Sequence, residues 1–217
     1  RRRMRGMMGM NNQRETAAGV TSYALENRDR YPESVATVGF GGHWNWQEPT
    51  MMIGFEKRDP QIHRAMSEYL GQYVRDARQL FCPSSPAEYP FLQQAWQAGD
   101  NWDNPQTPLG WDPLIGTYCF YWNYVGFIKG QTQVFRGPSR LGPARGQSQL
   151  LMSDYFGYDH WRSRDSFSSC ERLTDGQITP GTWVSAADWS RRAITTAQQV
   201  GSVRLQAAYT DGHVEVF

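Results

Sequence analysis

The sequence predicts an α+β fold, and three observations support this class. Two stretches with helical spacing of apolar residues lie in the first 80 residues, whereas strand-like runs dominate after residue 117. Near the C-terminus, Asp211-Gly212 separates two alternating runs, which is typical of a β-hairpin. Helices followed by strands favour an antiparallel sheet over an alternating α/β arrangement, and 217 residues suit one large domain.

The first predicted helix runs from Met7 to about Asn27. This stretch contains no proline, and it ends before Tyr31-Pro32 because a residue that precedes proline avoids the helical region. One face carries only small residues, methionine and a single leucine: Met10, Ala17, Ala18, Thr21, Ala24 and Leu25. Because this apolar face is weak, we expect the helix to be stable only when it packs against another helix or a sheet.

A second helix is predicted over about residues 60–78. Asp59 suits its N-cap, Pro60 suits its first turn, and the pattern stops before Cys82-Pro83. The apolar positions recur at spacings of three, four and seven: Ile62, Met66, Tyr69, Leu70, Tyr73, Val74 and Ala77.

The rest of the chain divides into a loop region and a sheet region. Residues 83–116 hold six prolines together with Trp96, Trp102 and Trp111, which predicts long aromatic-rich loops. Residues 117–217 contain β-type runs at 117–127, 149–156, 203–209 and 214–216. The predicted organisation is therefore a helix over 1–30 and a globular head over 31–217.

Composition excludes several classes of protein. With 22 basic against 21 acidic residues, the chain has no strong positive field for nucleic acid. Nine Trp, 11 Tyr and 10 Phe argue against disorder despite a mean hydropathy of −0.67. No run approaches the ~20 apolar residues that cross a membrane.

Candidate catalytic and metal-binding residues are few. There is no Gly-x-Ser-x-Gly sequence, and the four histidines lack zinc-site spacing. Aspartates on loops of the β region, Asp154 and Asp211 in particular, are candidate calcium ligands, with ordinary turn-forming aspartates as the alternative. A metal-dependent hydrolase would use Asp154, His160 and Asp211.

The loop tryptophans allow a second hypothesis. Trp96, Trp102 and Trp111 lie among acidic and amide residues, a composition that resembles surfaces that stack sugars. They would make the chain a module that binds an extracellular glycan or polymer; plain loop packing is the alternative.

Three cysteines leave at least one outside any intramolecular disulfide. If the compartment is oxidising, we expect a Cys82–Cys119 disulfide; three buried thiols are the alternative.

Several segments, taken in order, resemble bacterial pseudopilins of type II secretion systems and type IV pilin-like proteins, of the large sort abundant in planctomycetes. They are residues 10–15 (MNNQRE) with 23–32 (YALENRDRYP), 80–84 (LFCPS), 118–124 with Asn123, 150–154 (LLMSD) and 209–214 (YTDGHV). Departures from the family pattern are Gly9 and Met10 where it has a cysteine, Gly201 where it often has a histidine, and the long loop 85–116.

The resemblance implies a filament subunit without enzymatic activity. Its fold would be pilin-like, with residues 1–30 as the C-terminal half of a longer helix. An upstream apolar segment, processed by a prepilin peptidase and methylated at its N-terminus, would anchor the protein in the inner membrane of the bacterial cell envelope. Its head would lie in the periplasm before assembly. Copies of the chain would then form a helical filament with one another and with other pilins or pseudopilins, either in the periplasm or outside the cell. A loop calcium in such proteins makes Asp154 and Asp211 candidate ligands here, although no cofactor is required.

Overall fold

The structure is a computed structural model that describes residues 2–37, 49–55, 63–83, 91–103, 105, 114–127, 134–154, 156–158, 166–168 and 205–216. It combines helices with antiparallel strands, as an α+β fold requires. No helix within these ranges is both long and apolar enough to cross a membrane.

The N-terminal helix α1 spans Arg2–Glu26 and confirms the first predicted helix, with five more residues at its start. It ends where Arg28 and Asp29 adopt left-handed backbone angles (φ 58° and 61°). The side chain of Asn27 donates to the carbonyl of Tyr23 (2.8 Å), so it satisfies one of the last helical carbonyls.

The main sheet has four antiparallel strands in the order β11-β10-β7-β4. Their bounds are Tyr118–Phe120 (β4), Leu150–Asp154 (β7), Gln206–Tyr209 (β10) and Val214–Val216 (β11). The predicted Asp-Gly hairpin joins β10 to β11, and Gly212 there adopts a φ of 86°, which glycine tolerates without steric cost.

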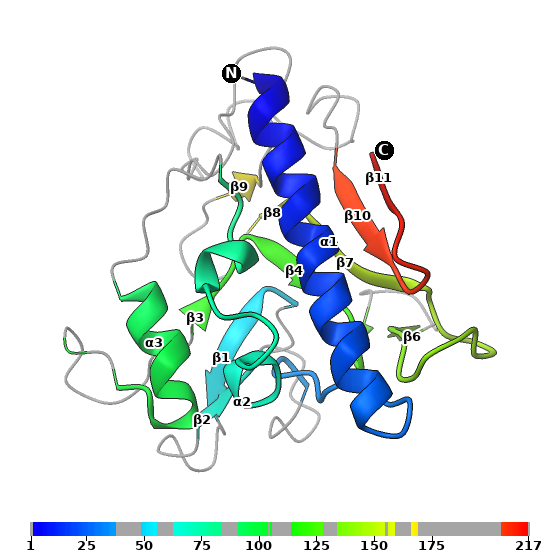
Figure 1. Cartoon of the computed structure of the whole chain (residues 1–217), viewed down its shortest axis with the longest axis horizontal. Coiled ribbons are helices and arrows are strands. Elements are labelled where there is room, and N and C mark those ends of the chain that lie inside the picture. The colour runs from blue at the N-terminus through cyan, green and yellow to red at the C-terminus, as the bar shows by residue number, and fades with distance from the viewer. Residues whose placement is uncertain are drawn as a thin grey trace.

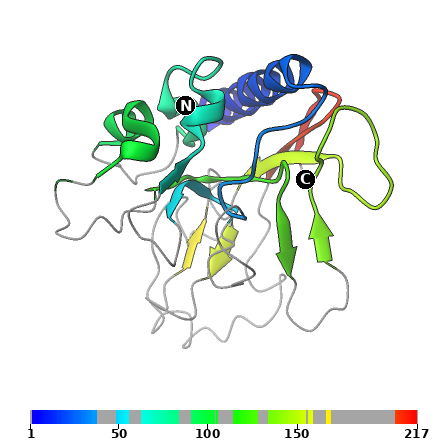
Figure 2. The same cartoon turned by 90° about the horizontal axis from the view of Figure 1, so that it is seen from below.

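Helix α1 lies across one face of this sheet and contacts β10, β7 and β11 (Figure 1). Seen from below, the hairpin of β5 (Val125–Phe127) and β6 (Val134–Arg136) extends on the opposite side (Figure 2). Strands β8 (Phe156–Tyr158) and β9 (Ser166–Ser168) form another two-stranded pair.

A second sheet, in the order β2-β1-β3, completes the head. Its strands are Met51–Phe55 (β1), His63–Ala65 (β2) and Leu114–Ile115 (β3). A continuous core of buried apolar side chains joins it to α1 and the main sheet, through residues such as Val20, Ile53, Leu70, Trp122 and Leu151.

The predicted helix over 60–78 is wrong. Residues 63–65 form strand β2 on β1, and only Ser67–Leu70 (α2) and the 3₁₀ turn Ala77–Leu80 (η2) are helical. The apolar spacing nevertheless marked the buried positions correctly, because Met66, Leu70, Val74 and Ala77 all lie in the core. Pairing with a neighbouring strand therefore outweighs the helical pattern at its start.

The stretch predicted as loops, residues 83–116, contains short ordered elements. Helix α3 spans Leu92–Ala98 and continues into the 3₁₀ turn Gly99–Asn101 (η3), while β3 begins at Leu114. Gln93 fixes α3 to η2, since its side chain accepts a hydrogen bond from the amide of Ala77 (2.9 Å).

Candidate functional site

The N-terminal half of α1 has an inverted distribution of side chains. Its buried face carries polar groups, Gln13 and Thr16, which are fully buried. Its outward face carries three large apolar side chains, Met4, Met7 and Met8, which are 61%, 64% and 48% exposed. Soluble helices usually turn such residues inward, and this outward row is here called the methionine stripe.

The polar side chains of α1 meet the sheet at a buried cluster, here called the polar junction: Gln13, Tyr118, Asp154 and Gln206. Gln13 Nε2 donates to Asp154 Oδ1 (3.1 Å) and to the carbonyl of Gln206 (3.3 Å). Asp154 Oδ2 accepts from the backbone amide of Gln206 (2.9 Å). One carboxylate, at the end of β7, thus holds both the helix and strand β10.

Close approach of α1 to the polar junction depends on glycine. Gln206 Nε2 donates to the carbonyl of Gly6 (3.0 Å). One turn later, a Cβ on Gly9 would lie only 2.8 Å from Gln206 Oε1 and 3.8 Å from the Tyr118 hydroxyl. Gly9 therefore lets the helix backbone lie against polar side chains of the sheet, whereas a Cβ on Gly6 would make only ordinary contact, at 3.7 Å from Gln206 Nε2.

Tyr118 brings a protonated hydroxyl to the polar junction. Desolvation by burial, followed by the negative charge of Asp154, raises its pKa, while interaction with the Asn12 side chain lowers it. Since the side chain is fully buried, its hydroxyl stays neutral at physiological pH. The polar junction therefore places a neutral hydroxyl near the Asp154 carboxylate. The hydrogen bonds of that carboxylate hold α1 and β10 in position.

Two further amides fasten the middle of this helix and the segment after it to the head. Asn12 Nδ2 donates to the carbonyl of Phe81 (3.1 Å). Asn123, with a left-handed φ of 51°, donates to the carbonyls of Tyr31 (2.9 Å) and Pro32 (2.7 Å). Asparagine tolerates that backbone conformation better than most residues, so it suits the position.

The candidate metal ligands do not come together. Asp154 lies beside the start of β10, whereas Asp211 lies in the exposed turn beyond its end, ~10 Å of strand away. Hydrogen bonds from the backbone and ring of His213 lower the pKa of Asp211. His160 lies outside the described residues. Within the described ranges, no group of three or more His, Cys, Asp or Glu side chains is placed to hold a metal ion.

Two of the three predicted sugar-stacking tryptophans belong to the core. Trp96 is 4% exposed and its indole donates to the carbonyl of Val74 (2.9 Å), while Trp102 is 7% exposed and packs against Phe91. The exposed surface predicted for them is therefore wrong, because α3 and the turn after it direct the rings inward. Trp111 lies outside the described residues.

The expected Cys82–Cys119 disulfide is also wrong. Cys82 is disulfide-bonded, but Cys119 is a buried thiol on β4. Cys170 lies outside the described residues.

Sequence reasoning missed the polar junction, apart from Asp154. Gln13 and Gln206 carry no local signal of burial in the sequence.

No protein-family model, curated protein or solved structure matches the chain. The class of protein is thus defined by the fold itself, an α+β head with a long N-terminal helix laid on an antiparallel sheet.

Proposed function

We propose that the chain is a structural subunit of a type II secretion pseudopilus or a type IV pilus-like filament. In this proposal α1 mediates contact between copies, and the head is displayed on the filament. The observation that carries it is the methionine stripe: the N-terminal half of α1 turns Met4, Met7 and Met8 outward while it buries polar side chains.

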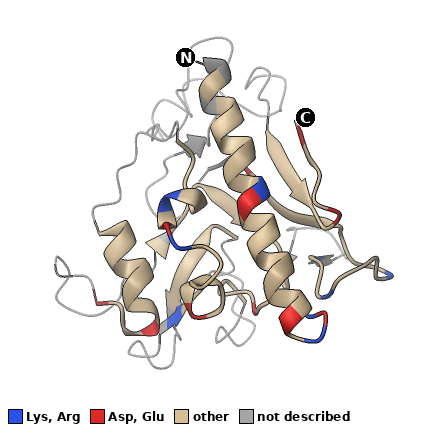
Figure 3. Cartoon of the chain, in the orientation of Figure 1, with Lys and Arg blue, Asp and Glu red and all other residues tan. Residues whose placement is uncertain are grey.

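The charge distribution of α1 supports the same role. From Gly6 onward its charged side chains are Arg14 and Glu15 near the middle and Glu26 at the end, and the stretches between them are uncharged (Figure 3). In the sequence, Arg2, Arg3 and Arg5 precede this part of the helix. The uncharged stretch from Gly6 to Gln13, which carries Met7 and Met8, suits packing against another helix, since methionine adapts its shape to its neighbour.

Several of the segments that resemble pilin-like proteins hold α1 on the head, which is a second support. Residues 10–15 contact Phe81 and Asp154, and Tyr31-Pro32 contacts Asn123. A helix that transmits force along a filament needs firm attachment to its own head, and these contacts would supply it.

Replacing the three methionines of the methionine stripe with negatively charged residues tests the proposal. In cells that produce the protein from its own gene, we expect the triple variant M4E/M7E/M8E to lose filaments in electron micrographs. The purified triple variant should also self-associate roughly tenfold or more weakly than the parent chain, because each methionine contributes apolar area to the contact.

Leu25→Glu is the matched control, since Leu25 is 66% exposed on the same face at the other end of α1. It introduces a charge outside the methionine stripe and should have a smaller effect. Circular dichroism spectra of all variants would check that each one folds. Undiminished filaments in the triple variant would overturn the proposal.

A further inference from the structure

Two arginines face each other directly at the C-terminal end of α1. Arg30 and Arg140 form an isolated antiparallel bridge between the loop after α1 and the loop after β6. The flanking hydrogen bonds run from the amide of Tyr31 to the carbonyl of Ser139 (3.1 Å) and from the amide of Leu141 to the carbonyl of Asp29 (2.8 Å). Arg30 and Arg140 are therefore a non-hydrogen-bonded pair, the kind in which side chains lie closest and on one face.

Among the described residues, this arginine pair has no acidic partner. Both arginines are exposed, and the ion pairs in the described part of the chain are Arg64–Asp100, Arg78–Asp76 and His213–Asp211. Like charges placed directly across a strand pair destabilise it. A backbone arrangement that places two arginine side chains on one exposed face thus gains stability when an anion binds to both of them.

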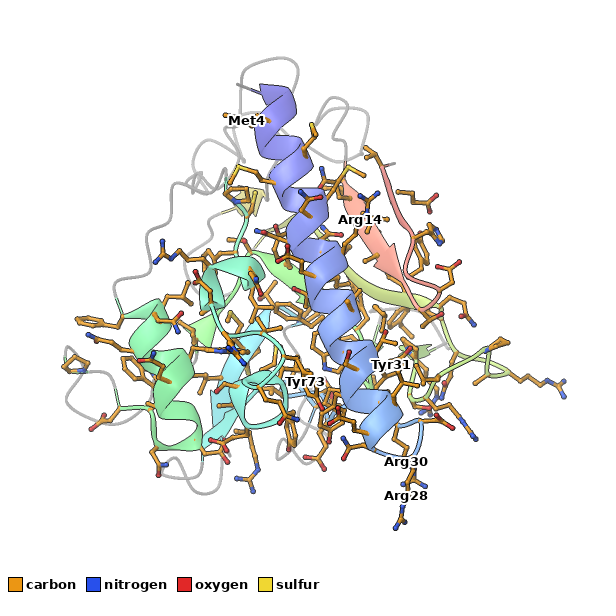
Figure 4. All side chains as sticks on the ribbon, in the orientation of Figure 1. Met4, Arg14, Arg28, Arg30, Tyr31 and Tyr73 are labelled. Atoms are coloured by element: carbon orange, nitrogen blue, oxygen red, sulfur yellow. The ribbon has the colours of Figure 1, made fainter. Side chains whose placement is uncertain are left out.

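Three carboxylates lie close to the arginine pair in the sequence, and Asp29, between Arg28 and Arg30, takes part in none of the ion pairs of the described residues. Glu26 accepts a hydrogen bond from the Tyr73 hydroxyl, and Glu33 accepts one from the Tyr69 hydroxyl (2.7 Å). Tyrosine therefore holds both carboxylates away from ion pairing with the arginine pair. Arg28 adds a third exposed cation, and with Arg30 it extends from the end of α1 away from the body of the molecule (Figure 4).

We propose that Arg30 and Arg140, with Arg28, bind the carboxylate groups of an acidic saccharide chain. A guanidinium group can bind a carboxylate through two parallel hydrogen bonds. Because all three arginines are exposed, the site can accept one segment of a long polymer. A continuous polyphosphate fits less well, because the chain carries a net charge of only +1 and nucleic-acid sites gather many more cations. The inference does not depend on filament assembly, since binding is measurable on the monomeric chain.

Binding of oligogalacturonate to the whole chain, measured by calorimetry at low salt, tests this site. We expect the acid oligomer to bind and its methyl ester of equal length, which lacks the negative charges, to bind at least tenfold more weakly. R30Q and R140Q should each weaken binding about tenfold or more, whereas R14Q, at an exposed arginine on α1 remote from the pair, should not.

Arg30→Glu separates binding from folding. It creates an opposite-charge pair with Arg140, so it should raise the Tm by ~1–4 °C while it abolishes binding. Three results would overturn the proposal: equal binding of acid and ester, unchanged binding in R30Q and R140Q, or tighter binding of a single-stranded oligonucleotide than of oligogalacturonate.

Discussion

The two halves of α1 are held on the head by different chemistry. The N-terminal half buries Gln13 and Thr16 and relies on hydrogen bonds to Asp154 and Gln206. The C-terminal half buries small apolar side chains, Ala17, Val20 and Ala24. Apolar burial is non-directional, whereas a buried carboxylate with fixed donors admits one position of the helix. We infer that the C-terminal half supplies most of the adhesion and the polar junction sets the register.

Aromatic contacts strengthen the C-terminal half. The Tyr23 ring meets Tyr69 and Tyr73 edge-on, with ring centroids 6.2 Å and 6.4 Å apart. Close packing here also involves Gly19, where a Cβ would lie 3.2 Å from side-chain atoms of Tyr73 and Val74. The inner face of the C-terminal half is thus packed closely against the head by small and aromatic side chains.

The largest effect is expected from Asp154→Ala. This variant removes the acceptor of Gln13 Nε2 and of the Gln206 amide, both buried, so we expect a loss of about 3 kcal/mol in the free energy of unfolding. Denaturant unfolding measures the loss. Hydrogen exchange should show that the amides of residues 4–16 lose more protection than those of residues 17–26.

Val20→Ala is the matched change in the other half. It should cost roughly 2 kcal/mol through lost apolar burial, with the greater loss of protection in residues 17–26. Equal loss of protection along the whole helix in both variants would show that α1 behaves as one unit. That result would refute the difference between its two halves.

Alanine at Gly9 and Gly6 tests the close approach within the N-terminal half. At Gly6 the added Cβ makes ordinary contact with Gln206 Nε2 (3.7 Å), so better helix propensity should stabilise the chain by about 0.5–1 kcal/mol. At Gly9 the Cβ displaces Gln206 Oε1, and we expect a net loss of about 1 kcal/mol from the strained contact. Thermal melts of both variants measure the difference; stabilisation by both would contradict a tight polar junction.

Alkaline pH should weaken the C-terminal half first. Burial, followed by the hydrogen bond to Glu33, raises the pKa of Tyr69, and the hydrogen bond to Glu26 raises that of Tyr73. Because the folded pKa values lie above the unfolded value of ~10, this stabilisation is complete below pH ~10 and is lost as pH rises through the raised values.

The double variant Y69F/Y73F should therefore lose less Tm than the parent chain between about pH 9 and about pH 11. The effect is small, since Tyr73 is at the surface. An identical pH dependence for both proteins would show that these two hydroxyls contribute nothing to holding α1.

Local patterns predicted part of this molecule well. The absence of proline defined α1, and Asp211-Gly212 defined the β10–β11 hairpin, because both depend on residues close in sequence. The second predicted helix failed for the opposite reason: residues 63–65 pair with β1, which no local pattern indicates. Trp96 and Trp102 were misplaced because composition does not state which side of an element faces the core.

The candidate sites depended even more on non-local contacts. Asp154 was singled out as a calcium ligand, but its partners are Gln13 and Gln206, which lie far from it in sequence and carry no spacing signal. The same holds for Arg30 and Arg140, which become neighbours only when two loops pair. The sequence motifs therefore drew attention to Asp154 but did not indicate that it holds α1 and β10 together.

The α+β class, the long N-terminal helix and the terminal hairpin could all be predicted from the amino-acid sequence. These follow from backbone preferences and short-range hydrogen bonds, which act within a few residues. The buried face of α1, the amides and the carboxylate that meet there, and the outward methionines became visible only in the folded chain. The physical reason is that burial and pairing are set by whichever distant segment packs against a residue, and the helical pattern of α1 was too weakly amphipathic to specify a face on its own.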